Sequence, residues 1–153
     1  MRSRARQRLA NITQQQDDTL AGGTFWTWKE QGGGGWSMWV GTEGEEGMHQ
    51  QETRRKLLCR ARPKVVAGQL TKLEYDADEQ TMLMEAEAPA DGGGDALVTV
   101  VYIPVDVTTD KVVADGAVED FSVEAFPDGS RLVSVTVQAA GESYRVGIGR
   151  DLN

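Results

Sequence analysis

Leu132-Val133-Ser134-Val135-Thr136-Val137 is the stretch that best indicates the fold, because valine returns at every second position. Successive side chains of a β-strand point to opposite faces of the sheet, so a period of two is typical of a strand with one buried face. We expect Val133, Val135 and Val137 to point into a hydrophobic core.

Further runs rich in strand-forming residues lie on either side of this stretch. Clusters of Asp, Gly, Pro and Ser, which are typical turn residues, separate them. The predicted strands are Gln69–Tyr75, Thr81–Ala88, Ala96–Ile103, Lys111–Ala114, Val118–Ala125, Arg131–Gln138 and Ser143–Ile148. Seven short strands over about ninety residues predict an antiparallel β-sandwich, which we place at residues 62–153.

The beginning of the chain has a different pattern. Residues 3–20 predict a helix with Leu9, Ile12 and Leu20 on a weak apolar stripe. We expect it to end at Ala21-Gly22-Gly23, where glycine can adopt the left-handed conformation that caps helices. A strand follows at once. Helix, loop and strand make half of an α/β unit, and we expect the parallel neighbours of this strand to lie outside the chain.

All four tryptophans lie within residues 22–39. The strand that contains Trp26 and Trp28 should break at Lys29-Glu30-Gln31, just before four consecutive glycines. Aromatic walls beside a charged pair suit a carbohydrate, because sugar C–H faces stack on indole rings while the hydroxyl groups meet polar side chains. From composition alone, the alternative is that these tryptophans are ordinary core residues.

Charge divides the chain unevenly. Residues 1–63 hold ten Lys/Arg against seven Asp/Glu, whereas residues 64–153 hold six against seventeen, and the whole chain has a net charge of −8. This acidic half would repel nucleic acid, so we expect no nucleic-acid partner. The sequence has no apolar run long enough to predict a membrane span, and it encodes no location.

Cysteine and histidine are scarce. The single cysteine, Cys59, excludes an internal disulfide and a cysteine-based zinc site. It lies on the apolar side of a predicted short helix at residues 53–60, and we expect it to be a buried thiol. His49 is the only histidine, which disfavours a histidine-centred triad or metal cluster. We therefore expect no cofactor and no metal.

Two motifs carry a resemblance to a known family. Phe25-Trp26-Thr27-Trp28-Lys29-Glu30-Gln31 with Gly35-Trp36-Ser37 resembles the eighth barrel strand and following loop of glycoside hydrolase family 5, above all its endoglycoceramidase-like and glucosidase members. Arg60-Ala61-Arg62-Pro63-Lys64-Val65-Val66-Ala67-Gly68 resembles the start of the C-terminal β-sandwich in that group. Lys64 departs from the pattern, since an aromatic residue is usual there.

The resemblance implies a mainly β chain, with an antiparallel β-sandwich preceded by a helix-strand remnant of a (β/α)₈ barrel. Residues 1–61 would be the incomplete C-terminal end of the catalytic TIM barrel. The family is made of retaining β-glycosidases, and its members imply a glucoside or glycolipid as the substrate. The rest of the barrel would then be a partner of this chain.

The resemblance also implies roles for individual residues. The two catalytic glutamates of the family belong to the fourth and seventh barrel strands and have no counterpart here, so we expect no catalytic residue in this chain. Trp26 matches the tryptophan under the sugar at the cleaved bond, and a cis peptide bond would follow it. Trp28, Lys29 and Glu30 would lie beside the cleft as substrate-binding residues. The alternative functions are a non-catalytic carbohydrate-binding protein and a purely structural β-sandwich.

Overall fold

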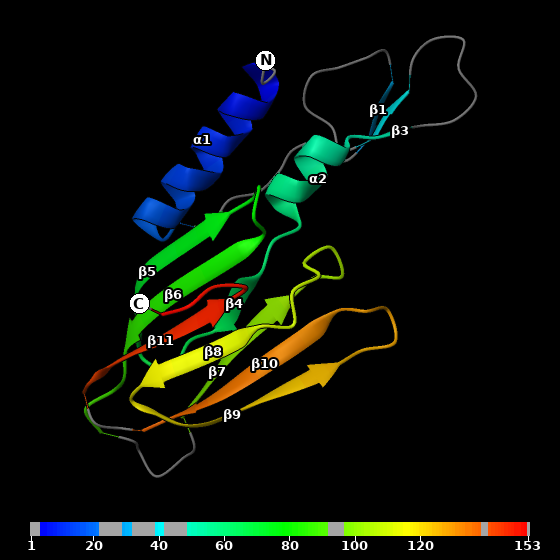
Figure 1. Cartoon of the computed structure of the whole chain (residues 1–153). Helices are drawn as coiled ribbons and strands as arrows, with labels where there is room; N and C mark the ends of the chain where they lie inside the picture. The colour runs from blue at the N-terminus through cyan, green and yellow to red at the C-terminus, as the bar shows by residue number, and fades with distance from the viewer. Residues whose placement is uncertain are drawn as a thin grey trace. The chain divides into compact units, whose positions relative to one another are not determined.

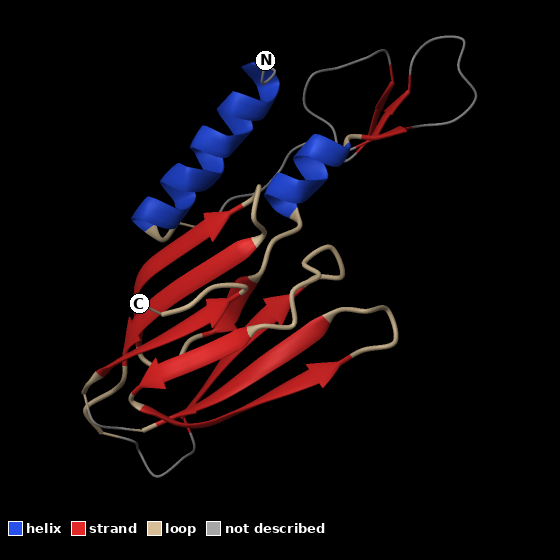
Figure 2. Ribbon diagram, viewed as in Figure 1, coloured by secondary structure: helices blue, strands red, loops and turns tan. Residues whose placement is uncertain are grey.

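The structure is a computed structural model that describes residues 4–21, 29–31, 39–41, 49–91, 97–138 and 141–152 (Figure 1). The chain divides into two compact units, Met1–Leu58 and Cys59–Asn153. Strands predominate over helices in the described residues (Figure 2). The predicted fold class, a mainly β chain with an antiparallel β-sandwich, is confirmed. No helix in the described part of the chain is both long enough and apolar enough to cross a membrane.

The first unit contains short elements of both kinds. They are α1 (Arg4–Thr19), β1 (Lys29–Gln31), β2 (Trp39–Gly41), β3 (His49–Gln50) and α2 (Glu52–Leu58). The helices expected at residues 3–20 and 53–60 are both present, and the second ends at Leu58, before Cys59. However, Lys29–Gln31 is a strand where we predicted a break, because its backbone pairs with β2. This pairing is parallel. The predicted strand with Trp26 and Trp28 lies outside the described residues.

The buried side of α1 is also different from the predicted stripe. Leu9, Thr13 and Asp17 are buried, and their spacing of four residues keeps them on one helix face. Ile12 and Leu20 are 43% and 39% exposed, so only Leu9 of the predicted stripe is a core residue. The polar side chain of Thr13 is accommodated there because its hydroxyl donates a hydrogen bond of 3.0 Å to the carbonyl of Ala10.

The cap of α1 is formed by a leucine rather than by glycine. Leu20 has a φ of 52°. Its N–H donates to the carbonyl of Asp17 at 3.3 Å, and the N–H of Ala21 donates to the carbonyl of Gln16 at 3.0 Å. These two bonds are those of a Schellman motif, which satisfies the last carbonyls of a helix. The left-handed position therefore falls two residues before Gly22, which lies outside the described residues.

The second unit consists of two four-stranded antiparallel sheets. One sheet has the order β4-β7-β10-β9 and the other has the order β5-β6-β11-β8. The strands are β4 (Arg62–Val65), β5 (Gln69–Asp76), β6 (Thr81–Glu87), β7 (Leu97–Ile103), β8 (Val112–Gly116), β9 (Val118–Ala125), β10 (Arg131–Val137) and β11 (Ser143–Ile148). All seven predicted strands are present, and their ends agree within two residues.

Within the second unit, β4 is the strand that the sequence pattern did not predict. It contains Pro63, which cannot donate a ladder hydrogen bond and is tolerated at the edge of a sheet. Among the described strands, β4 lies at such an edge and pairs only with β7, with an irregularity between Pro63 and Val65.

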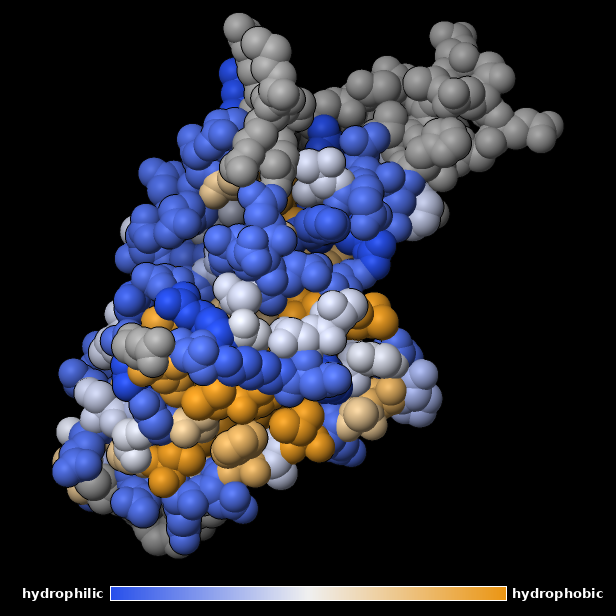
Figure 3. Space-filling model, in the orientation of Figure 1, coloured by the Kyte–Doolittle hydropathy of each residue, from blue (hydrophilic) through white to orange (hydrophobic). Residues whose placement is uncertain are grey.

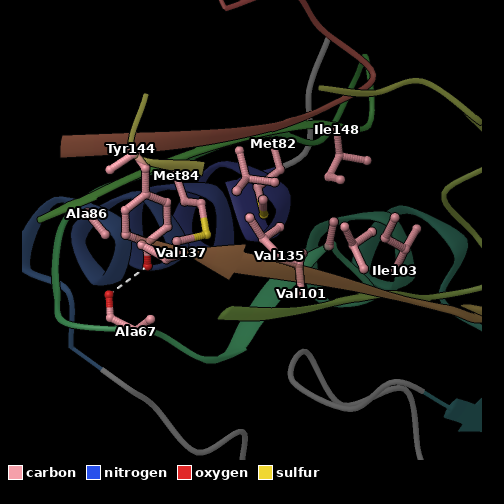
Figure 4. Packing of buried hydrophobic residues seen from close by; sticks show 14 of the residues in the cluster. Ala67, Met82, Met84, Ala86, Val101, Ile103, Val135, Val137, Tyr144 and Ile148 are labelled. Atoms are coloured by element: carbon pink, nitrogen blue, oxygen red, sulfur yellow. Dashed lines mark hydrogen bonds between the residues drawn. The ribbon is translucent and has the colours of Figure 1, made fainter. Parts of the chain in front are cut away.

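The core of the sandwich lies between the two sheets. Val133, Val135 and Val137 are at most 4% exposed, so the predicted inward face of β10 is confirmed. Met82 and Met84 of β6 face them from the other sheet, with Tyr144 and Ile148 of β11 (Figure 4).

Candidate functional site

The small sheet of the first unit contains two of the four predicted substrate-binding residues. Lys29 and Glu30 lie in β1. Trp26 and Trp28 lie outside the described residues, as does the expected cis bond between Trp26 and Thr27.

The pairing of this sheet brings distant residues into two rows. The register places Lys29 beside Trp39 and Trp39 beside Gln50. It also places Glu30 beside Val40 and Val40 beside His49. The side chain of Trp39 is half-buried.

The register adds two residues to those that the sequence had singled out. Trp39 and His49 share rows with Lys29 and Glu30, because β2 and β3 complete the sheet. No local pattern could have grouped His49 with Glu30. The tryptophan cluster was a signal for Trp39, but its partner across the sheet depends on the pairing.

The sandwich holds a buried polar cluster of Tyr144, Thr99 and Ala67. The Tyr144 hydroxyl donates to the carbonyl of Ala67 at 2.9 Å, as Figure 4 shows. It accepts from the Thr99 hydroxyl at 2.5 Å, and Thr99 in turn accepts from the N–H of Ala67 at 2.9 Å. Burial raises the pKa of Tyr144, while its hydrogen bonds with Thr99 and Ala67 act in the opposite direction. Every group in this ring is satisfied within it, so the cluster is structural.

A row of alternating charges crosses the outer face of the sheet β5-β6-β11-β8. Lys72 lies opposite Glu85, Glu85 opposite Arg145, and Arg145 opposite Asp115. Arg145 makes two hydrogen bonds to the Asp115 carboxylate, at 3.0 and 2.7 Å, and this contact raises the pKa of Arg145. Lys72 lies 3.0 Å from Glu74 and 3.6 Å from Glu85. These carboxylates are held by cations and join strands, which is a structural role.

Tyr75 has a buried hydroxyl that makes no hydrogen bond in the described part of the chain. Burial raises the pKa of Tyr75 to about 12, although the nearby Arg60 lowers it. The guanidinium of Arg60 lies 5.9 Å from the centre of the ring. The neighbouring Cys59 is only partly buried, so our prediction of a buried thiol was wrong. Among the described residues, no group of three or more His, Cys, Asp or Glu side chains could hold a metal ion.

Comparison with solved structures gives a likeness over almost the whole chain. Endo-glycoceramidase II from Rhodococcus sp., in a five-membered iminocyclitol complex, matches with a TM-score of 0.67 and 19% identity, covering 97% of this chain and 30% of that one. Its cellobiose-like isofagomine complex matches with a TM-score of 0.65 and 18% identity, covering 95% and 29%. Sterylglucosidase 1 from Cryptococcus neoformans, with tris, gives 0.46 and 18%, covering 62% and 14%.

The two endo-glycoceramidase II structures support the fold alone, because their identity to this chain is below 25%. The chain spans less than a third of the endo-glycoceramidase chain that it matches. Its sequence matches no protein-family model and no curated protein.

Proposed function

We propose that this chain is the C-terminal portion of a retaining β-glycosidase that hydrolyses the O-glycosidic bond of a glucoside or glycolipid. The observation that carries the proposal is the fold likeness to endo-glycoceramidase II over 97% of the chain. That enzyme was solved with an iminocyclitol and with a cellobiose-like isofagomine. The two motifs around Trp26 and Arg60 support the same assignment from the sequence.

In this proposal the first unit contributes one wall of the sugar cleft. Trp26 stacks against the sugar at the cleaved bond, and Trp28, Lys29 and Glu30 contact its hydroxyl groups. Residues 62–153 form a supporting β-sandwich, and residues 1–61 belong to the catalytic barrel.

The chemistry itself is assigned to the remainder of the barrel. Retaining hydrolysis uses two carboxyl groups about 5–5.5 Å apart, one as the acid/base and one as the nucleophile. The resemblance gives neither of them a counterpart here. This chain would orient the sugar and exclude water, and it would not hydrolyse glycosides alone.

A chimera tests the proposal. The segment of endo-glycoceramidase II that superposes on this chain is replaced by residues 1–153, and hydrolysis of a chromogenic β-glucoside and of a glycolipid is measured. We expect an active chimera. Trp26→Ala should lower kcat/KM by about 10- to 100-fold, because a stacking contact with the sugar is lost. Trp36→Ala is the matched control and should keep most of the activity.

The alternative functions give different results. A folded but inactive chimera, with sugar bound by residues 1–153 alone, would support a carbohydrate-binding protein. A folded, inactive chimera with no sugar binding in either form would support a purely structural sandwich. The unfolding transition of the chimera shows whether it is folded.

A further inference from the structure

Strand β9 has apolar side chains that the sandwich leaves exposed. In the register, Phe121 lies opposite Val135, and Val123 lies opposite Val133. Directly opposed residues of an antiparallel pair lie on the same face, so all four point toward the core side of their sheet. Val133 and Val135 are fully buried, whereas Phe121 is 39% exposed and Val123 is 45% exposed.

The offset between the two sheets explains this difference. The hydrogen bond between Thr99 and Tyr144 places β11 over β7. Strand β8 is next to β11 in one sheet, and β10 is next to β7 in the other. Because β8 is joined to β9 through the buried Ala117, the two orders run in the same direction, and β8 lies over β10. Strand β9 therefore extends beyond the last strand of the facing sheet. Figure 3 shows hydrophobic residues at the surface over the part of the sandwich where β8, β9 and β10 lie.

The outer edge of β9 also has free backbone groups. Within the described residues, β9 pairs with β10 on one side and with no strand on the other. The N–H of Phe126 donates to the carbonyl of Ser130, so these two residues are a hydrogen-bonded pair of the β9–β10 ladder. Hydrogen-bonded and non-hydrogen-bonded pairs alternate along an antiparallel ladder. Residues 120, 122 and 124 then bond to β10, and the N–H and C=O groups of Phe121, Val123 and Ala125 point away from the sheet.

The charge of this edge is acidic only. Residues 118–130 contain Glu119, Asp120, Glu124 and Asp128 and no Lys or Arg. Glu119, Asp120 and Glu124 are exposed, and none of the three forms an ion pair in the described part of the chain. Natural sheet edges are commonly protected by Lys, Pro or a bulge. The β9 edge contains neither Lys nor Pro, and its irregularity lies near Val118, away from Phe121 and Val123.

We propose that the free edge of β9 binds an extended segment of another polypeptide in which apolar residues alternate with Lys or Arg. The segment adds a strand to the sheet, its apolar residues cover Phe121 and Val123, and its cations face Asp120 and Glu124 on the outer face. Backbone bonds and alternating side chains are the two parts of recognition by strand addition.

A second copy of this chain fits the edge poorly. Two β9 strands would bring only carboxylates together, with Asp120 opposite Glu124 when Phe121 faces Val123. Like charges directly opposite one another destabilise a strand pair. The charge therefore favours a basic segment.

The test uses the full chain and fluorescein-labelled peptides of about eight residues, a usual strand length. One peptide alternates Val and Lys, and a matched peptide alternates Val and Glu. Fluorescence anisotropy gives the dissociation constants. We expect the Lys peptide to bind at least about tenfold more tightly than the Glu peptide, and its affinity to fall as salt increases.

Matched variants place the peptide on β9. Val123→Thr should weaken binding of the Lys peptide about three- to tenfold, since it makes the covered surface polar. Val65→Thr is the same change at a valine that is 54% exposed in β4, at the opposite edge of the same sheet, and it should have no effect. Glu124→Gln should weaken binding and flatten the salt dependence. Glu79→Gln, at an exposed glutamate in the turn between β5 and β6, should do neither. Thermal unfolding confirms that each variant is folded.

Hydrogen exchange gives an independent readout. The amides of Phe121, Val123 and Ala125 should exchange more slowly when the Lys peptide is bound. Equal affinities of the two peptides, equal effects of Val123→Thr and Val65→Thr, or protection elsewhere would overturn the proposal. Self-association that Val123→Thr abolishes would assign the edge to a second copy and would also overturn it.

Discussion

Tyr144 and Thr99, which are 45 residues apart in the chain, share a buried hydrogen bond that joins the two sheets of the sandwich. Thr99 belongs to β7 in one sheet and Tyr144 to β11 in the other. Both side chains are fully buried, and the backbone of Ala67 closes the ring on both of them. The ring fixes the sheets relative to one another and fixes the turn between β4 and β5 against both.

Removing the Tyr144 hydroxyl should therefore be costly. Tyr144→Phe leaves the buried O–H of Thr99 without the acceptor for its hydrogen and takes from the carbonyl of Ala67 the hydroxyl that donates to it. We expect the free energy of unfolding to fall by about 1–3 kcal/mol, measured by guanidinium denaturation. Tyr102→Phe, on the outer face of its sheet, is the control and should change it by less than about 0.5 kcal/mol. Equal effects of the two variants would contradict a structural role for the ring.

The Tyr75 hydroxyl should show the opposite behaviour. It is buried without a hydrogen bond in the described residues, so removing it ends a desolvation cost and breaks no bond. We expect Tyr75→Phe to keep or raise the free energy of unfolding by up to about 1 kcal/mol. A clear loss of stability would mean that the hydroxyl has a bonding partner.

The same residue predicts a pH dependence. Burial raises the pKa of Tyr75 from 10.0 to about 12. The unfolded chain releases this proton first, so the contribution is fully present below pH 10 and is lost as pH rises through 12. Stability should decline over this window and should decline less in Tyr75→Phe. Denaturation at several alkaline pH values measures the difference, and parallel curves for the two proteins would refute it.

Gly68 should not tolerate alanine. Its φ is +94°, and an added Cβ would lie 2.0 Å from the carbonyl oxygen of Glu87. Because backbone would have to move, we expect Gly68→Ala to cost more than about 3 kcal/mol. Gly141→Ala is the matched control, with a φ of +65° and an added Cβ no closer than 3.7 Å to its neighbours. It should cost only about 1–2 kcal/mol, from the left-handed backbone alone.

The turn before β10 should weaken in acid. The side chain and the backbone N–H of Ser130 donate to the Asp128 carboxylate, and these bonds hold the pKa of Asp128 below its ordinary value of 3.8. The contribution is present above pH 3.8 and is lost as pH falls through the folded-state pKa. Asp128→Asn should lower stability at neutral pH and should approach the wild-type stability in strong acid. Circular dichroism during acid titration tests this, and a constant difference would contradict it.

Glu30 should be a binding residue and not a catalytic one. In the chimera with endo-glycoceramidase II, Glu30→Gln should change KM more than kcat, and the loss in kcat/KM should stay within about tenfold. Loss of the catalytic acid/base or nucleophile would lower kcat by several orders of magnitude. An effect of that size in Glu30→Gln would make Glu30 catalytic.

Much of the fold follows from local pattern in the sequence. The alternation in Leu132–Val137 determined both the strand and its buried face, because the period of two is a property of the backbone itself. The turn residues likewise determined where seven strands end. For the candidate site, the sequence singled out Lys29 and Glu30 through the neighbouring tryptophans, but not their conformation as a strand.

Tertiary structure decided what depends on partners that are distant in the chain. The pairing of β1 with β2 made Lys29–Gln31 a strand and placed Glu30 in one row with His49, since ladder hydrogen bonds outweigh the weak preference of a short polar segment. The facing of the two sheets buried Val135 and exposed Phe121, although both belong to one strand pair and point to one side. The sequence determines which residues alternate, but only the packing of one sheet on the other determines which of them lose contact with water.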